Sequence, residues 1–325
     1  MTKEIVFLCL TDPKTGFGHL SRCITLANGL RKKGYKAIFL INQNLKTIEQ
    51  LRKKNFDFEK IPEFSSKINP KYDPRFVLKK MRSNGWETII VDMRNYGEKI
   101  SKFLKNSKLK VILLDDAWCK NPNADLIING TISKKYHKYK KINSNSKIFT
   151  GTKFWISNSE FSKYKKKVSE INYHKTYRIV ISMGGADPHE LTLKVVSSLM
   201  NLPNVLVTVI IGPFFKKSSK LKNQIKNSNV LLLYSPKKIW KEFHKSDLVI
   251  CASGNTLYEL CTQHIPTICI SSEPHQLEYA YDFSKKGFST NLGLWKKVNS
   301  NKIQQSVISL LINPKKRSLV NWSSI

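Results

Sequence analysis

The sequence has few acidic residues for its length. It contains 23 Asp and Glu against 56 Lys and Arg, a formal net charge of +33. Such an excess of positive charge raises the question of a nucleic-acid partner. The lysines are spread over the whole chain, however, and no zinc-finger, homeodomain or aromatic-rich RNA-binding pattern is present. We therefore expect no nucleic-acid partner, since a basic surface that attracts anionic substrates explains the charge as well.

Long apolar runs and paired cysteine motifs are also lacking. No stretch approaches the roughly 20 apolar residues of a membrane span, and the N-terminal apolar run is too short for a signal peptide. The six cysteines form no C-x-x-C motif, so reduced thiols in the core are expected. These absences predict a soluble, cytoplasmic protein, and 325 residues are enough for two domains.

What the sequence does contain is an alternation of short apolar runs with helical segments. Strands are expected at 5–10, 36–41, 88–91, 111–114, 126–129, 178–182, 205–211, 230–233, 248–251 and 267–270. Fully apolar strands separated by helices are typical of a parallel sheet covered on both faces. A lysine-rich segment at about 162–177 reads as a linker. The sequence thus predicts an α/β protein with domains at residues 1–165 and 166–325.

The loop after the first apolar run is the first candidate site. It contains Gly16 and Gly18, and the helix that follows has His19 and Arg22 three residues apart on its first turn. Glycines let the backbone approach a ligand, a helix N-terminus favours an anion, and a histidine can exchange a proton near neutral pH. The third glycine of the dinucleotide fingerprint is absent. A capping or packed histidine is the alternative interpretation.

Two loops in the second half form the second candidate site. Gly184 and Gly185 lie between a strand and a helix, a suitable place for a pyrophosphate. The loop at 253–255 follows another strand and opens another helix. Glu259 comes one helical turn later on the same face, where a carboxylate can accept hydrogen bonds from both ribose hydroxyls. Ordinary N-capping by the loop and a solvated glutamate are the alternatives.

Six motifs, taken together, resemble a known family. They are GFGHLSRCITLA at 16–27, LLDDAWCKNPNADLIING at 113–130, GTKFWISNSEF at 151–161, SMGGADPHELT at 182–192, ASGNTLYEL at 252–260 and HQLEYA at 275–280. In this combination the chain resembles the GT-B superfamily of nucleotide-sugar enzymes. It looks most like the UDP-sugar hydrolase of pseudaminic acid biosynthesis and its spore-coat polysaccharide relatives. The resemblance implies two Rossmann-like parallel-sheet domains facing a cleft.

The resemblance also implies an activity. The expected enzyme is a hydrolase that releases UDP from a UDP-activated sugar, such as a diacetamido-trideoxy sugar, by attack of water at the anomeric carbon. Such a reaction belongs to surface-glycan or nonulosonic acid biosynthesis. An inverting GT-B glycosyltransferase with a UDP-sugar donor is the first alternative, and a non-catalytic binder of sugar nucleotides or nucleic acid is the second. No metal and no cofactor are expected.

The resemblance assigns the role of catalytic base to His19. Together with the first loop, it implies substrate contacts from Gly16, Gly18, Arg22, Asp92, Tyr96, Gly184, Gly185, Ser253, Gly254, Asn255, Glu259, His275 and Gln276. The sequence departs from the family in places. Asp92 and Tyr96 are two residues further apart than in the family's D-x-Y, and His275 stands at a usual asparagine. The nucleotide half therefore follows the family more closely than the sugar half.

Overall fold

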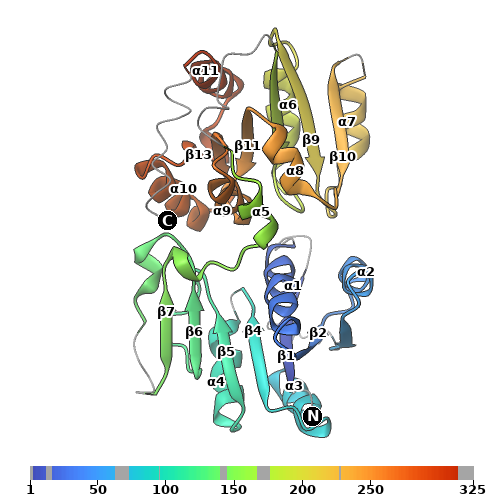
Figure 1. The fold of residues 1–325 in the computed structure, drawn as a ribbon, viewed down its shortest axis with the longest axis vertical. Helices are drawn as coiled ribbons and strands as arrows, with labels where there is room; N and C mark the ends of the chain where they lie inside the picture. Colours follow the sequence, from blue (N-terminus) through green and yellow to red (C-terminus); the bar gives the residue numbers. More distant parts are fainter. Residues whose placement is uncertain are drawn as a thin grey trace. The chain divides into compact units, whose positions relative to one another are not determined.

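The chain folds into two compact units, each built on one parallel sheet (Figure 1). The computed structural model describes residues 3–11, 17–62, 73–94, 96–139, 145–166, 176–226 and 228–313. The first unit comprises Met1–Ile156 and the second Ser157–Ile325. Each sheet has helices on both faces, as the apolar strands predict.

The segment 157–166 belongs with the second unit, whereas the sequence places the domain boundary at 165. Its short helix α5 (Ser159–Lys163) packs against α9 (Asn255–Gln263). The backbone N–H of Lys166 donates to the carbonyl of Gln263 at 2.8 Å, and the buried Lys166 ammonium donates to the carbonyl of Ser246. The rest of the expected linker lies mostly outside the described residues.

The first sheet has seven strands in the order β3-β2-β1-β4-β5-β6-β7. The strands are β1 (Glu4–Cys9), β2 (Lys36–Ile41), β3 (Asp57–Lys60), β4 (Thr88–Asp92), β5 (Lys110–Leu114), β6 (Leu126–Asn129) and β7 (Lys147–Thr150). The helices are α1 (Gly18–Arg31), α2 (Leu45–Lys53), α3 (Pro74–Ser83) and α4 (Gly97–Asn106). Successive residues of β1 point to opposite faces of the sheet. Phe7 packs with α1 and α2 on one face, and Leu8 packs with α3 and α4 on the other.

The second sheet has six strands in the order β10-β9-β8-β11-β12-β13. The strands are β8 (Tyr177–Ser182), β9 (Val205–Ile211), β10 (Val230–Tyr234), β11 (Leu248–Ala252), β12 (Thr267–Ser271) and β13 (Thr290–Leu294). The further helices are α6 (Leu191–Leu199), α7 (Ser218–Gln224), α8 (Ile239–Lys245), α10 (Pro274–Lys285) and α11 (Ser300–Leu311). Helix α6 packs against α11, and both join the core cluster on one face of the sheet.

Each sheet has one place where the strand order reverses. In the first unit it lies between β1 and β4, and in the second between β8 and β11. Open parallel sheets bind ligands at the carboxyl ends of the strands at such a switch point. His19, on the first turn of α1, and Asp92, at the end of β4, meet at the first of these points. The loops at 183–187 and 253–255 follow the two strands of the second.

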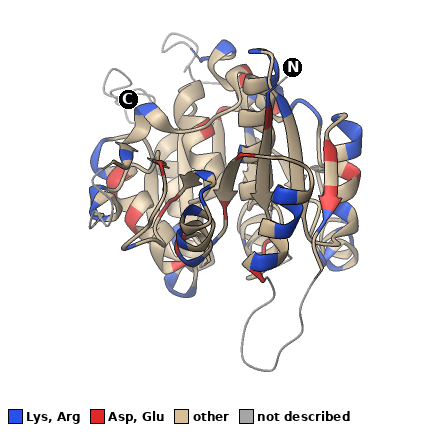
Figure 2. Ribbon diagram, turned by 90° about the horizontal axis from the view of Figure 1, so that it is seen from below, with Lys and Arg blue, Asp and Glu red and all other residues tan. Residues whose placement is uncertain are grey.

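The surface charge has no single basic face in the view of Figure 2. Lys and Arg are spread over many elements there, with Asp and Glu between them. The six cysteines are free and buried, which agrees with the expected core thiols. Among the described residues, no helix is both long and apolar enough to cross a membrane.

Candidate active site

His19 and Asp92 form a hydrogen-bonded pair at the switch point of the first sheet. His19 lies on the first turn of α1, and Asp92 is the last residue of β4. The His19 Nδ1 and Asp92 Oδ1 atoms are 2.7 Å apart. Because a carboxylate only accepts hydrogen bonds, we assign the ring proton to Nδ1, which leaves Nε2 as the acceptor. This arrangement equips His19 to act as a general base.

Arg22 joins this pair to a second carboxylate. Its Nε and one terminal nitrogen donate to the two oxygens of Asp92 at 2.9 and 2.7 Å, and its other terminal nitrogen donates to Asp116 Oδ1 at 2.5 Å. Burial alone would lower the pKa of Arg22, but Asp116 and Asp92 hold that pKa well above its ordinary value. Burial would raise the pKa of Asp92, but Arg22 and His19 hold that pKa below its ordinary value. Arg22 and Asp92 therefore stay ionised near neutral pH.

Arg22 and Asp92 are more deeply buried than the substrate contacts that the sequence leads us to expect. Arg22 is 6% exposed and Asp92 1% exposed. Both oxygens of Asp92 accept from protein groups, with the thiol of Cys23 as a further donor to Oδ2 at 3.4 Å. We therefore assign Arg22 and Asp92 as positioning residues for His19. The groups of the cluster that remain partly exposed are His19 at 14% and Asp116 at 18%.

Asp116 is a residue whose role the sequence leaves open, because an aspartate at the end of a strand can contact a ligand or cap the next helix. It follows β5, as part of a pair of aspartates that each read equally well as a helix cap. A signal was present, because an aspartate ends β4, two aspartates follow β5, and parallel neighbours end at the same sheet edge. The pairing with Arg22 spans 94 positions, and no local pattern indicates a contact of that range.

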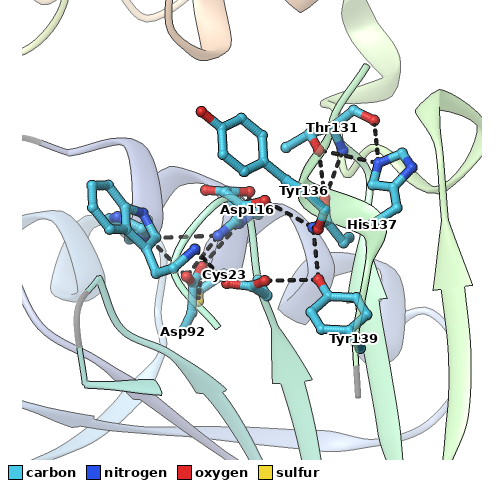
Figure 3. Close-up of polar contacts among 12 residues, drawn as sticks. Cys23, Asp92, Asp116, Thr131, Tyr136, His137 and Tyr139 are labelled. Atoms are coloured by element: carbon cyan, nitrogen blue, oxygen red, sulfur yellow. Dashed lines mark hydrogen bonds and ion pairs between the residues drawn. The ribbon is translucent and has the colours of Figure 1, made fainter. Parts of the chain in front are cut away.

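A second polar network adjoins the first and comprises Asp115, Asn129, Thr131, Tyr136, His137 and Tyr139 (Figure 3). The amide nitrogen of Asn129 donates to the carbonyl oxygens of Asp116 and Tyr136 at 2.8 and 3.0 Å, and to the hydroxyl of Tyr139 at 2.7 Å. That hydroxyl donates to Asp115 at 2.7 Å. Burial raises the pKa of Tyr139, so the hydroxyl keeps its proton. The network fixes the backbone of Asp116.

In the second unit, the loop at 253–255 and the start of α10 lie together. Gly254 is the N-cap residue of α9. As a glycine it has no side chain that could accept a hydrogen bond from the first N–H groups of this helix. Gln276 lies on the first turn of α10, which begins at Pro274. Its carbonyl oxygen accepts from the backbone N–H of Ser272 at 3.0 Å. Its amide nitrogen is 3.8 Å from the position of a Cβ on Gly254, so a donor faces the N-terminus of α9.

Ser253 precedes α9, and Glu259 lies about one turn inside it. Glu259 is half-buried and makes no ion pair or side-chain hydrogen bond with any residue in the described part of the chain. Burial raises the pKa of Glu259 to about 7. Ser253 is fully buried, and its hydroxyl accepts from that of Ser271 at 3.0 Å. A half-buried carboxylate without a protein partner is costly, which is typical of a group that binds a ligand.

The glycine loop after β8 differs from the expected pyrophosphate cradle. Helix α6 begins at Leu191, and its first free N–H groups, on Leu191 and Thr192, donate to the buried Asp187 carboxylate at 2.9 and 2.7 Å. The N-terminus of α6 is therefore occupied by a protein anion. Gly184 has a φ of +84°, which favours glycine, and a Cβ on Gly212 would clash with the backbone of Gly184 and Gly185. Gly184 therefore permits the turn after β8, and Gly212 permits the close approach of the backbone to this loop.

The remaining expected residues are placed as follows. Gly16 lies outside the described residues, Gly18 is the first residue of α1, and Tyr96 precedes α4 and packs on a core cluster. The His275 ring makes an edge contact with Tyr279, with the centroids 5.8 Å apart. Asn255 is the first residue of α9. The described residues contain no group of three or more His, Cys, Asp or Glu side chains suited to a metal.

Comparison with known proteins relates the second unit to a glycosyltransferase domain. Residues 188–321 match the glycosyltransferase family 28 C-terminal domain. The chain is 28% identical to the uncharacterized protein MJ1062 of Methanocaldococcus jannaschii, with 85% of this chain and 57% of that protein covered. It is 22% identical to the spore coat polysaccharide biosynthesis protein SpsG of Bacillus subtilis, with 86% and 80% covered.

A third relative is the pseudaminic acid cytidylyltransferase and UDP-2,4-diacetamido-2,4,6-trideoxy-beta-L-altropyranose hydrolase of Helicobacter pylori. The identity is 21%, with 87% of this chain and 47% of that protein covered. The chain thus spans only about half the length of this relative and of MJ1062.

Solved structures share the fold. The spinosyn rhamnosyltransferase SpnG complexed with thymidine diphosphate superimposes with a TM-score of 0.69 at 14% identity, covering 98% of this chain and 94% of that one. MurG of Acinetobacter baumannii gives 0.65 at 14% identity, covering 98% and 93%. The two parallel sheets and these likenesses show that the chain has the two-domain GT-B fold, and its second unit matches the glycosyltransferase family 28 C-terminal domain over residues 188–321.

Proposed function

We propose that this protein hydrolyses a UDP-activated sugar, with water attacking the anomeric carbon and UDP leaving. The observation that carries the proposal is the 2.7 Å hydrogen bond between His19 Nδ1 and Asp92. It fixes the ring so that Nε2 can take a proton from water, and the adjacent carboxylate stabilises the imidazolium that forms. Arg22 holds Asp92 through two hydrogen bonds, which keeps the acceptor in place.

The second unit would hold the nucleotide. Glu259 supplies a carboxylate for the two ribose hydroxyls, and the amide nitrogen of Gln276 with the N-terminus of α9 supplies donors for the diphosphate. Because the bond to the anomeric carbon breaks toward the diphosphate, donors there stabilise the charge of the departing UDP. The name of the Helicobacter relative supports UDP and a diacetamido sugar, and that of SpsG supports a surface-glycan pathway.

Glycosyl transfer is the second candidate. The family 28 domain and the similar solved structures are those of glycosyltransferases, and His19 would deprotonate an acceptor hydroxyl as readily as water. A protein that binds sugar nucleotides or nucleic acid without catalysis is a third candidate. No contact described in the site favours it.

A panel of UDP- and CDP-sugars, incubated with the protein in H₂¹⁸O, tests the proposal. Hydrolysis at the anomeric carbon releases UDP and leaves ¹⁸O in the sugar and none in the phosphate. Release should persist in EDTA, because His19 needs no metal to activate water. UDP release only when an acceptor sugar is added would replace hydrolysis by transfer. No release from any sugar would contradict both.

A further inference from the structure

We propose that Asp116 selects the sugar: it accepts a hydrogen bond from a hydroxyl or acylamino N–H of the sugar and disfavours sugars that carry a negative charge. The inference rests on the proposed function, because it assumes that a UDP-activated sugar reaches His19. It concerns a residue of the motif at 113–130 to which the resemblance assigns no role.

The first observation is that Asp116 is fixed from two sides. Arg22 donates to its Oδ1 at 2.5 Å, and the amide of Asn129 donates to its backbone carbonyl at 2.8 Å. Asn129 is fully buried and is itself held by Thr131, whose hydroxyl donates to its Oδ1 at 2.7 Å. A carboxylate fixed in this way loses little conformational entropy when it binds a ligand.

The second observation is that one carboxylate oxygen remains for a ligand. The contacts of the Asp116 side chain within the described residues involve Oδ1, and the side chain keeps 18% of its surface exposed. An ionised carboxylate accepts hydrogen bonds and donates none. The matching group on a sugar is therefore a donor, such as a hydroxyl or an amide N–H.

The third observation is that one side chain holds both Asp116 and the candidate base pair. The guanidinium of Arg22 bonds Asp116 with one nitrogen and Asp92 with another, and Asp92 bonds His19. The guanidinium of Arg22 thus links Asp116 to the pair of His19 and Asp92. His19 and Asp116 are both partly exposed. A sugar whose anomeric carbon lies near Nε2 of His19 comes within reach of Asp116.

The charges nearby decide which sugars fit. Arg22 carries one positive charge and already serves two carboxylates. A sugar carboxylate would meet the negative charge of Asp116, and like charges brought together weaken binding. A neutral sugar rich in donors meets no such penalty.

The test compares the affinities of UDP, UDP-glucose and UDP-glucuronic acid by calorimetry. The two sugars differ in that one carries a hydroxymethyl group where the other carries a carboxylate. The wild-type protein should bind UDP-glucuronic acid at least about tenfold more weakly than UDP-glucose. Asp116→Asn should bring this ratio close to one and leave the Kd of UDP unchanged, whereas Asp116→Glu should keep the discrimination.

Asp57→Asn is the matched control, because it removes one negative charge from an exposed position of the same unit, on β3. It should behave as the wild type does. Equal wild-type affinities for the two sugars, or an unchanged ratio in a folded Asp116→Asn protein, would overturn the inference. So would an equal loss for all three ligands, which would mark a structural role. Absence of UDP binding by the wild type would instead contradict the proposed function.

Discussion

A histidine serves as a base only while its acceptor nitrogen stays unprotonated and correctly aimed. In this protein Asp92 sets the aim of His19 from the end of β4. His19→Asn should lower kcat about 10²–10⁴-fold, the usual contribution of a general base. The Kd of UDP should stay within experimental error, because the nucleotide contacts that we propose lie in the second unit. Turnover by both proteins, with calorimetry on the same samples, checks this.

His264→Asn is the matched control, since it makes the same substitution at the left-handed C-cap of α9, a conformation that asparagine tolerates. It should keep full turnover. A folded His19→Asn protein that turns over at the wild-type rate would mean that His19 is a packing residue.

Glu259 links pH to stability and binding. Burial raises the pKa of Glu259 from 4.5 to about 7, so the folded protein holds this proton more tightly than the unfolded chain does. The free energy of unfolding should therefore fall as pH rises from about 4 to about 7, and Glu259→Gln should raise it at pH 8 by up to about 3 kcal/mol. At pH 4 the two proteins should differ little. Urea unfolding at both pH values measures this.

The same Glu259→Gln substitution should weaken UDP binding at pH 8 by about 1–3 kcal/mol, because the ribose hydroxyls lose a charged acceptor. A variant that is more stable and binds UDP as well as the wild type would remove Glu259 from the binding site. Wild-type affinity for UDP should also decline as pH falls through 7, since the protonated carboxyl is the weaker acceptor.

The role of His19 as a candidate base could be predicted from the sequence, but the side chains that contact it could not. A glycine loop before a helix is a local pattern, and the histidine beside it needs no further context. Asp92 is 73 positions from His19, and its contact follows only from β1 pairing with β4. A phosphate site at the N-terminus of α6 requires free N–H groups there. In the structure these groups donate to Asp187 instead. Local sequence does not show which anion a helix N-terminus binds.

At the scale of elements, the N-terminus of α6 depends on Asp187. Its carboxylate accepts from the N–H groups of Leu191 and Thr192 and is nearly buried. Asp187→Ala should lower the free energy of unfolding by about 1–3 kcal/mol, because two buried donors lose their acceptor. UDP affinity should not change. Urea unfolding and calorimetry on one preparation measure both quantities.

Asp73→Ala gives the comparison at a more exposed cap, where the side chain of Asp73 accepts from the N–H of Arg75 at 2.9 Å. Its effect should be smaller, because water replaces the lost acceptor. If the folded Asp187→Ala protein loses more than tenfold in UDP affinity, the diphosphate binds at the loop before α6, contrary to our expectation.

Elements with a strong apolar pattern were predicted well, and polar or edge elements were missed. Strands β2, β6 and β9 have the expected bounds. Strand β3 (Asp57–Lys60) reads DFEK and lies at the edge of its sheet, where one side is open and apolar residues are not required. Strand β13 contains a glycine, and helix α7 is mostly polar. Their places depend on neighbouring strands and helices rather than on their own sequence.

At the scale of the whole molecule, the two units have separate cores. The clusters of the described core residues draw either on the first unit or on the second. A unit with its own core can fold alone. A protein made of residues 157–325 should therefore unfold cooperatively and bind UDP within about threefold of the full chain, with no turnover. Calorimetry and thermal unfolding test this. Loss of UDP binding in a folded fragment would show that the first unit contributes to the nucleotide site.

The order of the strands also bears on how the chain is made. β8 is a central strand of the second sheet, yet one of its two neighbours, β11, comes much later in the chain, with Ile179 paired to Leu248. During synthesis β8 leaves the ribosome with one edge open until β11 follows. An open apolar edge on a nascent chain invites aggregation. Production at low temperature, which slows aggregation, or with a chaperone that covers such edges, should therefore raise the yield of folded protein.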